Sequence, residues 1–184
     1  MQATVAAPAE NGAHAVAADS RAGKYLVFQL GREEFGIRVL KVREIMGVQD
    51  ITAVPHTPAH VKGVINLRGK VIPVIDLRLK FGMCEVEYNQ RTCIIVVEVG
   101  GHESSMLMGI VVDGVAEVLS MTGTDIEDTP DFGSGLATPY LLGMAKIKGK
   151  VKILLEIDRV LTSQELGDIT PLFGERAGEE EGGK

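Results

Sequence analysis

The sequence lacks tryptophan altogether, and aromatic residues make up only 4% of its 184 positions. A hydrophobic core must therefore be built from aliphatic side chains, which the hydrophobic content of 45% is sufficient to supply. Only two cysteines are present, Cys84 and Cys93, and their spacing fits neither a disulfide framework nor a zinc ribbon or redox pair. These scarcities indicate an aliphatic globular protein of a reducing compartment.

Long apolar runs and clustered positive charge are also missing. No stretch approaches the roughly 18 consecutive apolar residues of a transmembrane helix, and the N-terminal residues lack the basic start and apolar run of a secretory signal. Lysine and arginine number 19 against 25 acidic residues, which gives a formal charge of −6. We expect no nucleic-acid partner, because phosphate binding requires a clustered cationic surface.

The two ends of the chain differ in composition from its middle. Residues 1–23 are rich in alanine without apolar periodicity and are predicted to be a disordered tail. Residues 174–184 are rich in glutamate and glycine and are predicted to be a second, acidic disordered tail. The folded body is therefore expected within residues 24–174.

Short runs of valine and isoleucine between glycine, proline and aspartate predict β-strands in this body. Pro73 falls within one run, which places that strand at an edge or a bulge. A short helix is expected from Thr57-Pro58 to Gly63, and a second at 161–167, where Thr162 and Glu165 fit a capping box. The predicted strands cover residues 25–30, 34–39, 64–67, 70–77, 93–99, 106–112, 115–119, 144–147 and 151–157.

The two halves of the body repeat one another. Because a unit of about 70 residues has a marginal core, two units should pack together, and closure into barrels removes exposed strand edges. The sequence thus predicts an all-β protein of two tandem five-stranded barrels, the first at about 24–88 and the second at about 89–160. Matching segments are Val27–Gly31 with Val96–Gly100, Gly36–Val39 with Gly109–Val112, Val42–Ile45 with Val115–Val118, and Gly69–Val71 with Gly149–Val151.

No arrangement of residues indicates an active site. Cys93 lies in a valine-rich and isoleucine-rich strand and is interpreted as a core residue. His56 and His60 have the spacing of two zinc ligands on a helix, but Pro58 lies between them and the glutamate of an HExxH motif is absent. Arg68 is predicted to project from a hairpin tip beside Gly69, and from these residues alone it is interpreted as a solvated turn residue, with a binding role as the alternative.

The longest informative stretch, Val61-Lys62-Gly63-Val64-Ile65-Asn66-Leu67-Arg68-Gly69-Lys70-Val71-Ile72-Pro73-Val74-Ile75-Asp76-Leu77-Arg78, closely resembles the signature of the CheW-like family of bacterial chemotaxis coupling proteins. The segments Phe35–Ile37, Val42–Ile45 and Gly109–Val115 resemble the same family. The resemblance spans about residues 24–166 and leaves the tails uncovered.

This resemblance implies two SH3-like barrels and a non-enzymatic adaptor without cofactor or metal. Family members bridge the cytoplasmic tips of methyl-accepting chemoreceptors to the regulatory domain of the histidine kinase CheA, so a cytoplasmic protein recruited to membrane receptor arrays is expected. It also implies the partner-binding residues: Val42, Glu44, Ile45 and Arg68 on a docking surface, Gly109 and Val115 near a groove between the barrels, and Asn66 and Gly69 as turn-shaping neighbours.

Two alternatives to a free-standing adaptor remain open. The same fold serves as the coupling module of larger scaffolds that carry a receiver domain, but no receiver segment follows in this sequence. A metal-dependent hydrolase using His56 and His60 is the alternative from another functional class, and metal analysis of the purified protein would separate it from an adaptor.

Overall fold

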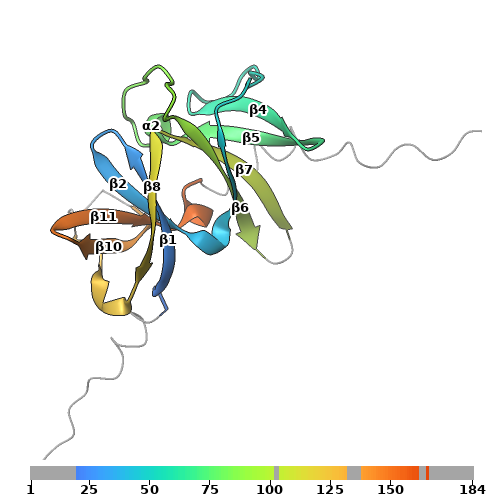
Figure 1. Ribbon diagram of the computed structural model, residues 1–184. Coiled ribbons are helices and arrows are strands. Elements are labelled where there is room, and N and C mark those ends of the chain that lie inside the picture. The colour runs from blue at the N-terminus through green and yellow to red at the C-terminus, as the bar shows by residue number, and fades with distance from the viewer. Residues whose placement is uncertain (1–19, 102–103, 132–137, 162–164, 166–184) are drawn as a thin grey trace, which may run out of the picture.

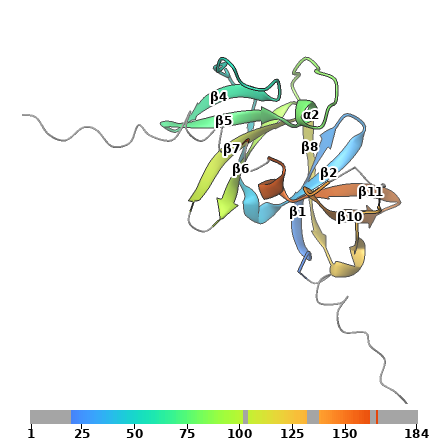
Figure 2. The same ribbon diagram turned by 180° about the vertical axis from the view of Figure 1, so that it is seen from behind.

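The computed structural model describes residues 20–101, 104–131, 138–161 and 165, and this part of the chain is built mainly of β-strands (Figures 1 and 2). The all-β prediction is confirmed. The strands are β1 (Gly23–Leu30), β2 (Glu33–Arg38), β3 (Val42–Gly47), β4 (Val61–Leu67), β5 (Lys70–Asp76), β6 (Cys93–Gly101), β7 (Ser104–Val112), β8 (Gly114–Met121), β9 (Ile126–Glu127), β10 (Leu141–Ile147) and β11 (Lys150–Leu155). The short helical segments are η1 (Val39–Lys41), α2 (Leu77–Lys80), η2 (Gly123–Asp125) and η3 (Ile157–Arg159).

The strands form two sheets, each curled into a small barrel. One barrel has the order β3-β6-β7-β5-β4 and uses one continuous stretch of chain, so we call it the inserted barrel. The other has the order β8-β1-β2-β11-β10-β9 and combines the first two strands with the last four, so we call it the discontinuous barrel. Two barrels are therefore confirmed, but the expected division at residues 88 and 89 is wrong.

The reason is that the two copies of the repeat exchange strands. The first strand of each copy pairs with the third strand of the other, β1 with β8 and β6 with β3. The second strand of each copy runs parallel to the last strand of the other, so that Gly36 pairs with Leu154 and Gly109 with Val74. Through this exchange of strands, each copy covers strand edges that the other copy would leave open if it folded separately. The repeat remains visible, because the strands of the two copies pair in matching registers.

The core lies mostly between the barrels. In β1, Tyr25 and Val27 face the interior of the discontinuous barrel, while Leu26, Phe28 and Leu30 face the other way into a core shared by both barrels. The same alternation in β6 divides its residues between the inserted barrel and the shared core. The shared core contains Leu26, Phe28, Leu30, Phe35, Ile37, Val61, Ile75, Leu77, Ile95, Val97, Val99, Met108, Ile110, Val112, Leu155, Ile157, Val160 and Leu161.

The inserted barrel is closed by a short contact between Thr52, which follows β3, and Val64 in β4. Each of these residues donates its backbone N–H to the carbonyl oxygen of the other at 2.9 Å. Gly63 has a φ of +138°, and a Cβ atom there would lie 2.0 Å from the Thr52 oxygen. The predicted helix ending at Gly63 is wrong, because β4 already begins at Val61 and needs this glycine for close approach.

Pro73 is not on an edge strand, because β5 has a neighbour on both sides, but the pairing of β4 with β5 shifts register between Val61 and Gly63, next to the Val64–Pro73 pair. It lies opposite Val64, whose backbone groups pair with Thr52 instead, and the ladder to β7 begins only at Val74. The missing N–H of Pro73 is therefore not needed by either ladder. The strand also ends one residue earlier than expected, since the Asp76 carboxylate accepts the backbone N–H groups of Arg78 and Leu79 and starts α2.

The ends of the folded body differ slightly from the expected limits. β1 begins at Gly23, within the predicted tail, and the Tyr25 hydroxyl donates to the Arg21 carbonyl oxygen at 2.6 Å. Arg21 also pairs with Asp128 at 2.9 Å, which attaches this segment to the discontinuous barrel. Residues 1–19, the acidic tail at 174–184 and all but residues 161 and 165 of the expected helix 161–167 lie outside the described residues.

Candidate functional site

Arg68 occupies the tip of the β4–β5 hairpin, as its sequence position predicts. Arg68 and Gly69 have φ values of +51° and +84°, the positive values that a two-residue type I′ turn requires. The Asn66 side-chain oxygen accepts the Gly69 backbone N–H at 2.8 Å and stabilises this geometry. The left-handed backbone conformation of Arg68 costs about 1 kcal/mol, because the residue has a Cβ atom. The Arg68 side chain is 79% exposed, so burial within the chain does not offset this cost.

Glu44 on β3 lies beside this turn. Its Oε1 accepts a hydrogen bond from Arg68 Nη2 at 3.1 Å. β3 and β4 are at opposite ends of the sheet order, so barrel closure is what brings the two side chains together. An exposed pair of this kind is worth about 0–1 kcal/mol, so its main effect is to orient two charged groups at the surface.

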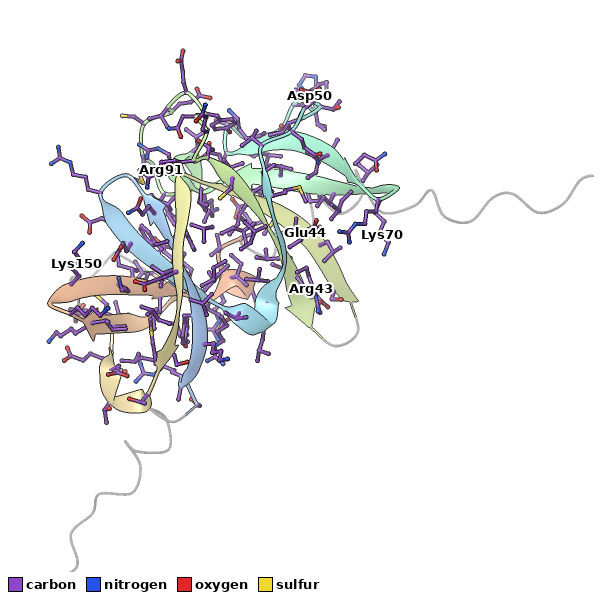
Figure 3. All side chains as sticks on the ribbon, viewed as in Figure 1. Arg43, Glu44, Asp50, Lys70, Arg91 and Lys150 are labelled. Atoms are coloured by element: carbon purple, nitrogen blue, oxygen red, sulfur yellow. The ribbon has the colours of Figure 1, made fainter. Side chains whose placement is uncertain are left out.

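Apolar side chains are exposed on the same barrel. Ile45, next to Glu44, is 45% exposed, and Val71, just after the turn, is 53% exposed. Arg43 on β3 forms an ion pair with Glu98 on β6. Figure 3 shows Arg43, Glu44 and Lys70 on one flank of the inserted barrel. We call Glu44, Ile45, Arg68, Lys70 and Val71 the β3–turn surface; it carries opposite charges and exposed aliphatic groups, with Glu44 and Ile45 on opposite faces of β3.

Sequence reasoning missed Val71 as a member of this surface. The repeat contained a usable signal, because the positions matching Ile45 and Val71 in the second copy are Val118 and Val151, and these are 53% and 46% exposed. Both copies thus have an exposed apolar residue just after the turn, and burial in the core does not explain why these residues are apolar. Exposed apolar residues of this kind indicate a binding surface.

The other three expected site residues lie elsewhere. Val42 and Val115, which match one another in the repeat, are partly buried and pack against the shared core. Gly109 is buried in β7, where a Cβ atom would lie 2.9 Å from Ile94 and 3.3 Å from Val74. Gly109 therefore serves close packing inside the inserted barrel, and its expected place near a groove between the barrels stays a prediction.

The second copy has a turn of the same shape but without the same ion pair. Lys148 and Gly149 have φ values of +51° and +75°, matching Arg68 and Gly69. Glu117 matches Glu44, yet within the described ranges no ion pair joins Lys148 to Glu117. The oriented charge pair is thus a property of the inserted barrel, and Lys148 is a matched control for experiments on Arg68.

The described residues contain no group of three or more His, Cys, Asp or Glu side chains that could hold a metal ion. The backbone of His56 has a φ of +61°, whereas His60 lies next to β4 with its side chain 14% exposed and Nε2 3.2 Å from a Glu165 carboxylate oxygen. Burial lowers the pKa of His60, and the nearby Lys80 lowers it further. The two imidazoles thus have separate surroundings instead of a common ligand set.

One hollow in the surface and the lengths of the helices also bear on what the protein can bind. A hollow at the discontinuous barrel is lined by Gln29, Arg32, Glu33, Glu34, Lys150 and Val151, a charged wall unlike the apolar pockets that hold small molecules. The helices in the described ranges are all too short or too polar to cross a membrane.

Known proteins resemble this chain over the whole folded body. Residues 24–165 match the family model described as CheW-like domain. The chemotaxis protein CheW of Klebsiella aerogenes is 44% identical over 143 residues, which cover 78% of this chain and 84% of that protein. CheW of Rhizobium meliloti is 39% identical over 140 residues, covering 76% and 88%. The crystal structure of the scaffolding protein TtCheW from Thermoanaerobacter tengcongensis matches with a TM-score of 0.69 at 33% identity, covering 78% of this chain and 95% of that one.

Proposed function

The chain belongs to the CheW-like domain family, so it is a non-enzymatic chemotaxis adaptor with the two-barrel SH3-like fold. On that premise we propose that it couples methyl-accepting chemoreceptors to the histidine kinase CheA. We place it in the cytoplasm, recruited to membrane receptor arrays through these partners. The observation that carries the proposal is the exposed ion pair between Glu44 and Arg68 on the inserted barrel.

The β3–turn surface has the composition of a protein-binding surface. Ile45 and Val71 offer aliphatic area that is not buried within the chain, and burial against a partner would stabilise a complex. Arg68 is held in a defined orientation by the turn and by Glu44, so little side-chain freedom is lost on binding. We infer that this surface docks one protein partner, with the charges setting orientation and the aliphatic groups supplying affinity.

A second partner needs a second surface, for which the edge of the shared core is suitable. Val42 and Val115 lie there with their burial incomplete. Leu40, in the η1 segment just before Val42, is 85% exposed, which is unusual for a leucine without a partner. We propose that a helical hairpin of the receptor packs here, because an amphipathic helix gains affinity from aliphatic contacts of this kind.

The direct test is Arg68→Glu, with Lys148→Glu as the matched control. Both substitutions reverse a charge at the same position of the same turn type, but only Arg68 is predicted to contact a partner. We expect Arg68→Glu to weaken binding to the CheA regulatory domain or to a receptor-tip fragment by about thirtyfold, or about 2 kcal/mol, because the reversed charge would be repelled by a partner surface complementary to arginine. Isothermal titration calorimetry against each fragment gives both affinities.

Two outcomes would contradict this assignment. Unchanged affinity for both fragments would show that the Arg68 turn is not a docking element. Equal losses in the two variants would indicate an effect of net charge alone. Circular dichroism of both variants is expected to match the wild type, because both side chains are at hairpin tips.

A charge exchange separates orientation from contact. In the double variant Glu44→Arg with Arg68→Glu, the pair can form again with its polarity reversed. If Glu44 and Arg68 affect binding only through their ion pair with each other, the double variant should recover binding. If they contact the partner directly, the double variant should bind as weakly as Arg68→Glu. We expect the second result.

A further inference from the structure

Two aspartates form equivalent clusters where the chain passes between the barrels. In the first, Asp113 Oδ2 accepts the Gly31 backbone N–H at 2.6 Å and also pairs with Arg78 Nη1. The side chains of Arg78 and Asp113 are 13% and 26% exposed. We call this cluster the Asp113 clasp.

The second cluster has the same plan. Asp158 Oδ1 accepts the Gly100 backbone N–H at 3.0 Å, and Asp158 Oδ2 lies 2.6 Å from Lys41 Nζ. Gly31 and Gly100 are matching positions of the repeat, and Arg78 and Asp158 follow the last strand of each copy at matching places. We call this cluster the Asp158 clasp.

Each clasp joins segments of both barrels. Gly31 lies between β1 and β2 of the discontinuous barrel, Arg78 lies in α2 after the last strand of the inserted barrel, and Asp113 is on the crossover from β7 to β8. In the Asp158 clasp these roles are exchanged: Gly100 is in the inserted barrel, Asp158 follows the discontinuous barrel, and Lys41 is on the crossover from β2 to β3. The polarity is exchanged as well, since one crossover supplies the anion and the other the cation.

The clasps also adjoin the shared core. Leu77 and Ile157, the first residues of α2 and η3, are buried in that core, and Arg78 and Asp158 directly follow them. Apolar packing is not directional, so aliphatic contact alone permits several relative orientations of two barrels. Hydrogen bonds and ion pairs have preferred distances and angles, and the clasps are positioned to select one orientation.

We propose that the Asp113 and Asp158 clasps fix the angle between the two barrels and thereby the distance between surfaces on opposite barrels. Replacing both carboxylates with neutral amides leaves each glycine N–H only an uncharged acceptor and removes the charged partner of each cation. The shared core stays apolar and the barrel interiors are untouched. The expected result is a folded protein whose barrels sample a wider range of angles.

The experiment measures the distance between spin labels on opposite barrels. Lys70 and Lys150 are exposed at matching positions of the repeat, and Figure 3 shows them on opposite sides of the molecule. Both are replaced by labelled cysteine in a background with Cys84→Ser and Cys93→Ala. The clasp variant carries Asp113→Asn and Asp158→Asn, and the matched control carries Asp50→Asn and Glu87→Gln.

For the clasp variant we expect a broader distance distribution by double electron–electron resonance, whereas the control retains the parent distribution. Amide hydrogen exchange at Gly31 and Gly100 should accelerate about tenfold or more, because each N–H loses a charged acceptor. The amides of Val27 and Val96, inside the barrels, should keep their protection. This combination of changes supports the proposal.

Two results would overturn it. An unchanged distance distribution with faster exchange at Gly31 and Gly100 would make the aspartates local turn acceptors only. Equal acceleration at Val27 and Val96 would indicate loss of overall stability instead of a change of angle. If the double aspartate variant does not fold, Arg78→Gln with Lys41→Gln removes the cations and keeps the acceptors, and an unchanged distribution there would equally refute the proposal.

Discussion

Gly63→Ala is expected to open the inserted barrel at its closure. The added Cβ atom would lie 2.0 Å from the Thr52 carbonyl oxygen and 2.7 Å from the Thr52 carbonyl carbon. Both atoms belong to the backbone, which no change of side-chain rotamer can move away. The Thr52 segment must therefore leave Val64, and the two hydrogen bonds of 2.9 Å between them are lost.

The magnitude follows from these contacts. Two backbone hydrogen bonds contribute about 2 kcal/mol together. Alanine at a φ of +138° adds backbone strain of about 1–3 kcal/mol. We expect the free energy of unfolding to fall by about 3–5 kcal/mol, a large part of the roughly 5–15 kcal/mol typical of a native protein. For a folded body of this size, the melting temperature should fall by about 10 °C.

Chemical denaturation followed by circular dichroism measures this loss, with two glycines as comparisons. Gly47→Ala has no neighbouring atom within 4 Å and should change stability by less than about 0.5 kcal/mol. Gly143→Ala, at the matching place in the second copy, would bring a Cβ atom within 2.8 Å of the Glu127 oxygen and should have an intermediate effect. If Gly63→Ala were no less stable than Gly47→Ala, the closure by Thr52 and Val64 would be refuted.

Two buried polar contacts give further predictions. Lys152, which is 4% exposed, pairs with Glu34 across β11 and β2. Glu34→Gln leaves its buried ammonium group without a charged partner and should lower the free energy of unfolding by about 3 kcal/mol. The double variant Glu34→Gln with Lys152→Met should lower it by less than about 1 kcal/mol. The hydrogen bond from Lys152 lowers the pKa of Glu34, so this stabilisation is present above the ordinary pKa of a glutamate and is lost as the pH falls through the lowered pKa. Urea unfolding at neutral and acidic pH measures it, and a pH-independent difference between the wild type and Glu34→Gln would contradict the reasoning. Tyr88→Phe removes the hydroxyl that donates to the buried carboxylate of Asp76 at 3.1 Å and should cost about 1–2 kcal/mol in the same assay; an equally stable variant would show that this hydrogen bond contributes nothing. Burial and the neighbouring Asp76 raise the pKa of Tyr88, so its ultraviolet titration should occur at higher pH than that of free tyrosine.

The strands were predictable because valine and isoleucine alternate or run together between turn residues, and the repeat located equivalent elements in both halves. The exchange of strands was not predictable, because periodicity shows which residues form a strand but not which strand it joins. β1 and β3 of one copy would pair as plausibly with each other as with strands of the second copy. The division into consecutive barrels was wrong for this reason.

The candidate site was predictable in part. Arg68 and Gly69 are consecutive residues of a turn, so local sequence was enough to place the arginine at an exposed tip. The contact of Arg68 with Glu44 depends on closure of the barrel through Thr52, which no local pattern encodes. The packing role of Gly109 was not predictable, because a glycine needed for close packing and a glycine near a groove look alike in sequence.

The insertion of one barrel into the other imposes an order on synthesis at the ribosome. All five strands of the inserted barrel have been translated once residue 112 has emerged, whereas the β1–β2 hairpin must wait for β8 and β11. Glu34 and Lys152, which pair across β2 and β11, are 118 residues apart. During elongation the nascent chain therefore carries a complete inserted barrel together with a β1–β2 hairpin whose two edges are still unpaired. Unpaired strand edges are prone to aggregation, so we expect this hairpin to be the segment that most needs a chaperone.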